Sequence, residues 1–257
     1  MTDAERRAAL DAIAAEVNVC TRCRLHTGRT RAVPGEGNPD TEVVFVGEGP
    51  GFNEDRQGRP FVGRAGDLLV KLLGSIGWRR EDVFITNIVK CRPPDNRDPE
   101  PDEIAACLPY LQRQLTVLDP ALVVTLGRHS MGRFMPGARI SQAHGTVRSA
   151  DPATGASDAL VYALYHPAAA LRSTEVERQS FEDVAGIPRA LLDARSKRAD
   201  RMIAATDAGP TDSTDSTESA EPTAAVTPPA TTIAAPPVSA AALPPPDAPP
   251  DDQLTLF

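Results

Sequence analysis

The chain has 257 residues, 41% of them hydrophobic, which is enough to bury the core of a globular domain of ordinary size. Its net charge of −8 is concentrated near the C-terminus, because residues 1–200 carry −1 and residues 201–257 carry −7. The near-neutral part can still present a basic face, so the composition excludes no nucleic-acid-binding function. It does exclude a conventional transmembrane helix, because no run of about 20 apolar residues is present.

Helices and strands are predicted to alternate along the chain. Residues 1–17 have the pattern of an amphipathic helix rather than of a signal peptide, so we expect a cytoplasmic protein. Apolar spacing predicts helices near residues 3–17, 65–76, 101–118 and 175–196. Short β-branched runs predict strands near residues 43–47, 83–88, 121–126 and 160–165.

This alternation indicates an α/β fold, a three-layer α/β/α sandwich around a central, mainly parallel four-stranded sheet. Sheets of this kind bind ligands beyond the carboxyl ends of their strands. Three distinctive segments lie at such ends: GEGPG at 47–51, TNIVKCRPP at 86–94 and YHPAAALR at 165–172. We therefore expect these segments to meet at one edge of the sheet.

The four cysteines of the chain form a candidate metal site. Cys20 and Cys23 are spaced as C-x2-C, and Cys91 and Cys107 follow later in the chain. Paired disulfides are rare in the cytoplasm, so a four-thiolate site is the favoured interpretation. Zinc and an iron–sulfur cluster suit such ligands equally well, and two unrelated pairs of reduced cysteines are the alternative.

The glycine-rich loop at 47–51 does not have the pattern of a phosphate-binding loop. It lacks the Lys-Ser/Thr pair of a P-loop, and Pro50 interrupts the G-x-G-x-x-G spacing. Glu48 would also repel a phosphate. A tight strand-to-helix turn with a solvated glutamate is the simplest alternative for this loop taken alone.

Taken together, GEGPGFNEDRQGRPFVGRAG, TNIVKCRPP, YHPAAALR and the four cysteines resemble the iron–sulfur uracil-DNA glycosylases, family 4 of their superfamily. The resemblance covers roughly residues 18–195. It implies an enzyme that flips uracil out of single- or double-stranded DNA and hydrolyses its N-glycosidic bond, leaving an abasic site. It also implies a 4Fe-4S cluster on the four cysteines, with zinc as the alternative.

The resemblance assigns a role to each residue of a uracil pocket. Phe61 would stack on the extruded base, and Gly49 would line the pocket. The amide of Asn87 would read the base edge, since it offers an acceptor for N3–H and a donor for O4. Glu54 would crowd out the methyl group of thymine.

The chemistry implied is cleavage through a cationic sugar with uracil leaving as an anion. His166 would stabilise the charge on uracil O2. Glu48 would position a water and stabilise the cation. Better-known relatives carry an aspartate at the position of Pro50, so how Glu48 shares this work with backbone groups stays open. The other histidines, His26, His129 and His144, are expected to be surface or packing residues.

DNA contacts are expected around the pocket. Leu171 and Arg172 would fill the space that the base vacates. The basic residues expected to contact phosphates are Arg56, Arg59, Arg64, Lys90 and Arg92. One subgroup of the superfamily traps DNA covalently through a basic, histidine-containing insertion, but RPPDNRDPEPDE at 92–103 is acidic, so turnover is expected.

The C-terminal part is expected to be a linker that ends in a short binding peptide. Residues 207–250 contain 11 prolines in 44 residues and no aromatic residue, which predicts disorder beyond a catalytic domain at 1–206. Within residues 251–257, QLTLF resembles the peptides that bind the DNA polymerase sliding clamp. Its contacts would come from Gln253, Leu254, Leu256 and Phe257.

Two other functions stay open at this stage. The chain could be a metal-stabilised module that binds uracil-containing DNA without activity, or a nucleotide-processing enzyme that uses the glycine loop. The glycosylase itself is expected to be a monomer.

Overall fold

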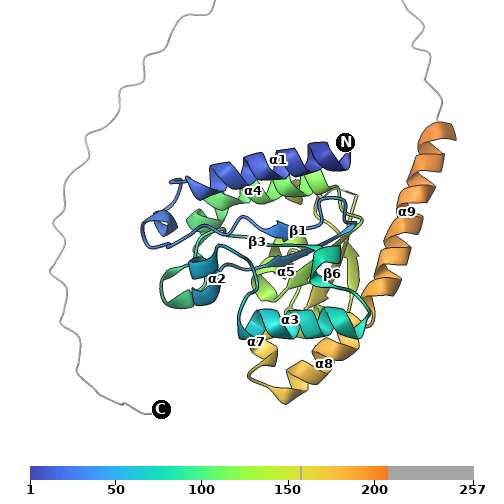
Figure 1. Ribbon diagram of the computed structural model, residues 1–257. Helices are drawn as coiled ribbons and strands as arrows, with labels where there is room; N and C mark the ends of the chain where they lie inside the picture. Colours follow the sequence, from blue (N-terminus) through green and yellow to red (C-terminus); the bar gives the residue numbers. More distant parts are fainter. Residues whose placement is uncertain (157, 208–257) are drawn as a thin grey trace, which may run out of the picture. The chain divides into compact units, whose positions relative to one another are not determined.

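The computed structural model describes residues 1–156 and 158–207 (Figure 1). The expected linker at 207–250 lies outside the described residues, except for Asp207. The expected C-terminal peptide at 251–257 also lies outside them.

The described residues build a six-stranded sheet in the order β1-β3-β2-β4-β6-β5. Its strands are β1 (Glu36–Gly37), β2 (Val43–Gly47), β3 (Phe84–Asn87), β4 (Leu122–Leu126), β5 (Val147–Ser149) and β6 (Leu160–Leu164). The four inner strands are parallel to one another and match the predicted strands. The two short outer strands, which the sequence did not predict, pair antiparallel with β3 and β6. The predicted mainly parallel sheet is thus confirmed and is two strands wider.

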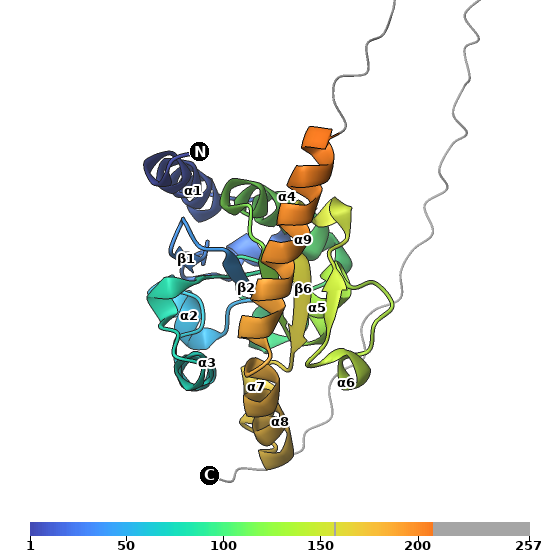
Figure 2. The same ribbon diagram turned by 90° about the vertical axis from the view of Figure 1, so that its right-hand side faces the viewer.

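Helices cover both faces of this sheet (Figures 1 and 2). One layer contains α1 (Asp3–Asn18), α4 (Pro101–Leu118), α5 (Arg128–Phe134) and α6 (Ile140–Ala143). The other contains α3 (Arg64–Ser75), α7 (Pro167–Ala170), α8 (Thr174–Val184) and α9 (Ile187–Asp207). The short helix α2 (Phe52–Gln57) lies in the loop between β2 and α3. This arrangement confirms the predicted three-layer sandwich.

The hydrophobic core is divided by the sheet into two clusters. Val44 and Val46 of β2 pack with α1, α4 and α5, whereas Val43 and Phe45 pack with α3 and α9. Successive strand residues point to opposite faces, so a strand that is buried on both sides must be apolar throughout. This explains the VVFVG run that predicted the strand.

The helix predicted at 175–196 is two helices. The first, α8, ends at Val184 and the second, α9, begins at Ile187. The hydroxyl of Tyr162 donates a hydrogen bond to the carbonyl oxygen of Asp183 at 2.7 Å. A Cβ on Gly186 would lie 2.4 Å from that hydroxyl, so only glycine permits this approach. Such a tertiary contact has no local sequence signature.

The parallel strands all end at one edge of the sheet. The segments that follow β2, β3 and β6 meet there, as the sequence predicted, and the segment after β4, which was not part of that prediction, joins them. Within the described part of the chain, no helix is long and apolar enough to cross a lipid bilayer.

Candidate active site

A cleft of about 680 Å³ lies at the carboxyl edge of the sheet. The predicted site residues that line it are Glu48, Gly49, Glu54, Phe61, Asn87, His166 and Arg172. They come from the segments after β2 and β6 and from the end of β3. Leu171 is not among the lining residues, but its side chain is 37% exposed directly beside Arg172.

Gly47 allows the floor of this cleft to form. The register of β2 and β3 pairs Gly47 with Asn87. A Cβ on Gly47 would lie 2.3 Å from Oδ1 of Asn87 and 2.6 Å from Cζ of Phe61. Any side chain here would therefore displace both residues, so glycine is required for the amide and the ring to lie side by side.

Asn87 carries an unpartnered polar atom at the bottom of the cleft. The residue is 1% exposed, and its Oδ1 is buried and has no hydrogen-bond partner among the described residues. Its backbone carbonyl accepts a 2.8 Å hydrogen bond from Nζ of Lys90, which fixes the strand end. Buried amide oxygens normally accept a hydrogen bond, so this atom is suited to a donor on a ligand.

Phe61 is held in an uncommon backbone conformation. Its φ of 48° lies in the left-handed region. The guanidinium of Arg80 donates to the carbonyl oxygen of Phe61 at 3.0 Å and also to that of Pro60. Arg80 is in turn ion-paired with Glu36 at 2.9 Å. The Phe61 ring lies 5.6 Å from the His166 ring, tilted by 32°, so the two rings form adjacent walls of the cleft.

His166 is oriented by its own helix. Its Nδ1 accepts a 3.1 Å hydrogen bond from the backbone N–H of Ala168 at the start of α7. Burial, with a smaller contribution from the charge of Arg172, lowers the pKa of His166 to about 4. The neutral ring therefore carries its proton on Nε2, which is available as a hydrogen-bond donor.

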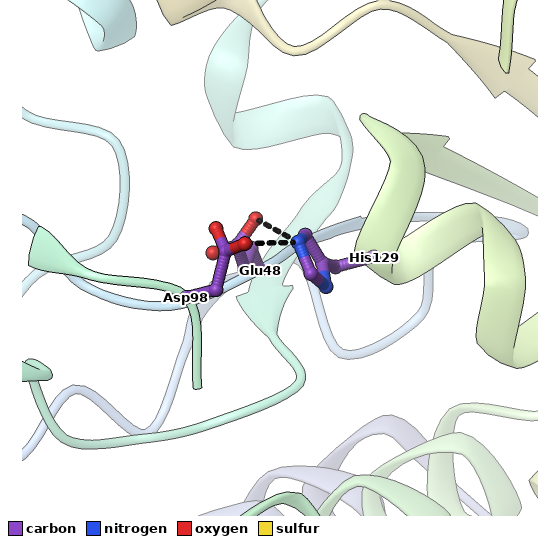
Figure 3. Close-up of side chains that lie close together, drawn as sticks. All are labelled: Glu48, Asp98 and His129. Atoms are coloured by element: carbon purple, nitrogen blue, oxygen red, sulfur yellow. Dashed lines mark ion pairs between the residues drawn. The ribbon is translucent and has the colours of Figure 1, made fainter. Parts of the chain in front are cut away.

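Glu48 belongs to a cluster of ionisable side chains with Asp98 and His129 (Figure 3). Nε2 of His129 lies 3.2 Å from Oδ2 of Asp98 and 3.8 Å from Oε2 of Glu48, without hydrogen-bond geometry to either. Arg128 forms an ion pair with Asp98. Burial raises the pKa of Glu48, and the neighbouring His129 acts in the opposite direction.

The sequence did not predict that His129 lies beside Glu48 and Asp98. Sequence reasoning also missed Asp98. Asp98 lies in the loop before α4 and His129 lies in α5, the helix after β4. Neither has a local motif, and the sheet topology brings both to Glu48. The other two histidines make local contacts: His26 Nδ1 lies 2.8 Å from the carbonyl oxygen of Cys23, and His144 Nδ1 lies 2.8 Å from Oδ2 of Asp183.

Glu54 lies at the side of the cleft. Its Oε1 accepts a 3.1 Å hydrogen bond from the N–H of Val62. Burial raises the pKa of this carboxyl, while hydrogen bonds from backbone N–H groups oppose the increase. The bond to Val62 joins α2 to the Phe61 loop and fixes where the carboxyl lies.

Comparison with known proteins identifies the family. Residues 34–185 match the sequence model of the uracil DNA glycosylase superfamily. The chain belongs to this superfamily. It is 48% identical over 186 residues to the Type-4 uracil-DNA glycosylase of Saccharolobus solfataricus, covering 71% of this chain and 86% of that protein. The Type-4 enzymes of Sulfurisphaera tokodaii (48% identity, 68% of this chain, 81% of that protein) and Thermotoga maritima (45%, 70% and 93%) are similarly close. The family-4 resemblance found in the sequence is confirmed.

The four cysteines of the chain line one small pocket next to α1 and α4. Cys91 and Cys107 are buried, and Cys20 and Cys23 are half-buried. This placement disfavours two unrelated pairs.

Hydrogen-bond donors surround these sulfurs. Nη1 of Arg29 donates to Cys91 at 3.1 Å, and the N–H of Lys90 donates to Cys107 at 3.2 Å. Burial raises the pKa of the Cys107 thiol to about 11 and also raises that of Cys91. The apolar pocket by itself therefore favours protonated thiols. Four converging sulfurs with N–H donors fit a thiolate-bound cation, which would stabilise the ionised form.

The basic residues that were expected to contact DNA phosphates differ in exposure and in their partners. Lys90 is 1% exposed and donates to Thr86, Asn87 and Gln114, so its prediction as a phosphate contact is wrong. Arg59 is partly exposed but bonded to Glu36 at 2.8 and 2.9 Å.

Proposed function

We propose that this chain is a uracil-DNA glycosylase that extrudes uracil from DNA and hydrolyses its N-glycosidic bond, leaving an abasic site for base excision repair. The observation that carries the proposal is the buried, unpartnered Oδ1 of Asn87 in the cleft that Phe61 and His166 also line, where the superfamily motifs meet. The similarity to Type-4 uracil-DNA glycosylases supports the reaction and the substrate.

Three residues would recognise the base. The Phe61 ring would stack on the extruded pyrimidine. Oδ1 of Asn87 would accept N3–H of uracil, while its amide N–H would donate to O4, a pattern that cytosine reverses. Glu54 would lie beside the 5-position and crowd out the methyl group of thymine, and Gly49 would leave room for the base.

Two residues would carry the chemistry. As the C1′–N1 bond breaks, the electron pair leaves with uracil and negative charge develops on O2. Nε2–H of neutral His166 would donate a hydrogen bond to that oxygen. Glu48, as a carboxylate, would stabilise the cationic sugar, orient the water that forms the new bond to C1′ and accept its proton.

The four cysteines would hold a 4Fe-4S cluster, with zinc as the alternative. When bound, the metal group would connect the end of α1 with the segment after β3 and with α4, as a structural support remote from the base. Purified protein with broad visible absorbance that is lost on oxidation would support the cluster. Colourless protein that contains one zinc would support the alternative.

DNA would be engaged around the cleft in single- or double-stranded form, by a monomer. Leu171, exposed beside Arg172, would enter the space that the base vacates. The acidic segment at 92–103 favours turnover over covalent trapping.

We also propose that the C-terminal QLTLF binds the DNA polymerase sliding clamp, with 207–250 as the linker from the catalytic domain at 1–206. Contacts would come from Gln253, Leu254, Leu256 and Phe257. Tethering would raise the local concentration of a cytoplasmic, nucleoid-associated enzyme on replicating DNA. Deletion of residues 253–257 is expected to abolish capture of the chain by purified clamp, and unchanged capture would refute this role.

The catalytic proposal is tested with oligonucleotides that carry one uracil. Wild-type protein is expected to generate alkali-labile abasic sites, whereas His166→Ala and Asn87→Ala are expected to lose at least about 100-fold in rate. Specific binding without cleavage would instead identify a binding module. Protection of the protein by a mononucleotide, with no effect of DNA, would favour a nucleotide-processing enzyme.

A further inference from the structure

Phe52 is an exposed aromatic residue at the mouth of the cleft. It is the first residue of α2 and follows Gly51, which lines the cleft. Its side chain is 52% exposed. The guanidinium carbons of Arg92 and Arg56 lie 5.2 Å and 5.6 Å from the centre of its ring. Two cations thus contact one exposed ring, and they come from separate segments of the chain.

These two arginines have no carboxylate partner in the part of the chain that the structure describes. Nε of Arg92 donates to Oδ1 of Asn96 at 2.7 Å, and its terminal nitrogens make no hydrogen bond to any residue that the structure describes. Some other arginines near the cleft do pair with carboxylates: Arg59 and Arg80 share Glu36, and Arg128 pairs with Asp98. Arg172, which lines the cleft, donates instead to the carbonyl oxygen of Ala168.

The type of partner determines what an arginine can still bind. A carboxylate uses the in-plane N–H donors of a guanidinium and cancels its charge. An aromatic ring instead contacts the flat face and leaves both the donors and the charge available. Arg56 and Arg92 are therefore oriented by Phe52 and still able to bind an anion.

We infer that Phe52, Arg56 and Arg92 form a phosphate clamp for the DNA strand that carries the extruded nucleotide. A nucleotide that enters the cleft brings its flanking phosphodiesters to the edge of the cleft. Phe52 and Arg92 directly adjoin Gly51 and Pro93, which line the cleft. Bidentate guanidinium–phosphate hydrogen bonds suit this position. The inference rests on the proposed DNA substrate but not on cleavage of the base.

The clamp is tested by the salt dependence of binding. The full-length, metal-loaded protein would be titrated with oligonucleotides that contain a tetrahydrofuran abasic analogue, single-stranded and duplex, in about 50–200 mM KCl. Each lost phosphate contact is expected to reduce the slope of log affinity against log salt by about 0.7 on single strands and about 0.9 on duplex. Arg56→Ala and Arg92→Ala are each expected to show this reduction.

Arg7→Ala is the matched control. Arg7 is exposed on α1 and lines neither pocket, so its substitution removes the same charge away from the cleft. Its slope is expected to equal that of the wild type. Unchanged slopes for both clamp arginines, or equal reductions in all three variants, would overturn the inference.

The role of the ring is tested separately. Phe52→Leu keeps an apolar side chain but removes the aromatic face, and it is expected to weaken binding about three- to fivefold. Phe52→Tyr is expected to bind like the wild type. Combining Phe52→Leu with Arg92→Ala is expected to cost less than the sum of the two changes, since the ring acts through the arginine. Full affinity of Phe52→Leu would contradict the clamp.

Failure of the clamp can be distinguished from failure of the proposed function. If the wild type binds the analogue with the predicted slopes but releases no uracil, the glycosylase proposal fails and the clamp stands. If uracil is released while the arginine variants retain the wild-type slope, the clamp fails and the glycosylase proposal stands.

Discussion

Glu48 shows how single neighbours determine the ionisation of a site residue. Its side chain is half-buried, which raises its pKa, and three charged or titratable neighbours change that pKa further: His129, Asp98 and Arg128. His129 and Arg128 favour the carboxylate, whereas Asp98 disfavours it. The carboxylate that we propose to stabilise the cationic sugar thus lies beside two residues, His129 and Asp98, that shift its pKa in opposite directions.

Substitutions of His129 and Asp98 are expected to shift the pH dependence of base release in opposite directions. His129→Gln removes a group that lowers the pKa of Glu48, so the acid limb of the pH–rate profile is expected to move to higher pH. Asp98→Asn removes a group that raises this pKa, so the limb is expected to move to lower pH. Single-turnover rates across the acid range measure both shifts, and movement in the same direction would contradict this account.

His166 links the site to the stability of the fold. Its folded-state pKa of about 4 lies below the value of about 6.5 for an unfolded histidine. As pH falls through that window the unfolded chain binds a proton that the folded chain does not, so stability decreases. His166→Asn keeps a side-chain acceptor for the N–H of Ala168 but cannot titrate. The decrease in urea-unfolding free energy from neutral to acidic pH is therefore expected to be smaller in this variant, and an equal decrease would contradict the shifted pKa.

Among the elements, the short strand β1 supports the loop that carries Phe61. Glu36 of β1 binds both Arg59 and Arg80, and Arg80 reaches the backbone carbonyls of Pro60 and Phe61. The left-handed conformation of Phe61 is thus stabilised by a neighbouring element.

Loss of this support is expected to affect both stability and substrate recognition. Arg80→Met leaves the carbonyl of Phe61 and the carboxylate of Glu36 short of donors, and it is expected to lower the free energy of unfolding by about 1–3 kcal/mol and to raise KM for uracil-containing DNA. Arg79→Met is the matched control, because Arg79 pairs only with exposed Glu81 and Asp82. Equal effects of the two substitutions in both measurements would argue against the supporting role.

The four apolar inner strands could be predicted from the sequence, whereas the shortest strands and helices could not. The strands β2, β3, β4 and β6 are apolar throughout and were predicted to within one or two residues. Strands β1 and β5 contain two and three residues, which is too short for a periodic pattern. Helices α2 and α5 are also short, and α2 lies in a segment rich in glycine and polar residues.

Within the site, residues that belong to recognisable motifs could be predicted, whereas the others could not. Asn87 and His166 belong to segments with recognisable motifs, and both line the cleft as predicted. Asp98 and His129 have no such motif. They follow β3 and β4, the strands on either side of β2, and this topology brings them to Glu48 after β2. The burial of Lys90 was also unpredictable, because its partner Gln114 lies on another element, α4.

At the scale of the whole molecule, the cysteine pocket joins segments that are distant in sequence. It connects the end of α1 with α4, which α1 also contacts through an ion pair between Glu16 and Arg113. A metal group bound there would close a long loop and stabilise the N-terminal helix.

Removal of one thiol is expected to release this helix. Cys20→Ser should lose bound metal, lower the Tm and speed amide hydrogen exchange in α1 more than in the strands of the sheet. Arg113→Ala, which removes only the ion pair, is expected to leave the metal content unchanged. Wild-type metal content and exchange in Cys20→Ser would contradict a four-cysteine site.

The central claim is that the cleft binds an extruded uracil and stabilises the anion that leaves. Chromatographic detection of free base after incubation of the full-length, metal-loaded chain with DNA containing uracil tests it most directly. We expect stoichiometric release of uracil, with no release of thymine or cytosine from matched strands. Uracil that stays attached to deoxyribose in both single-stranded and duplex DNA would contradict it.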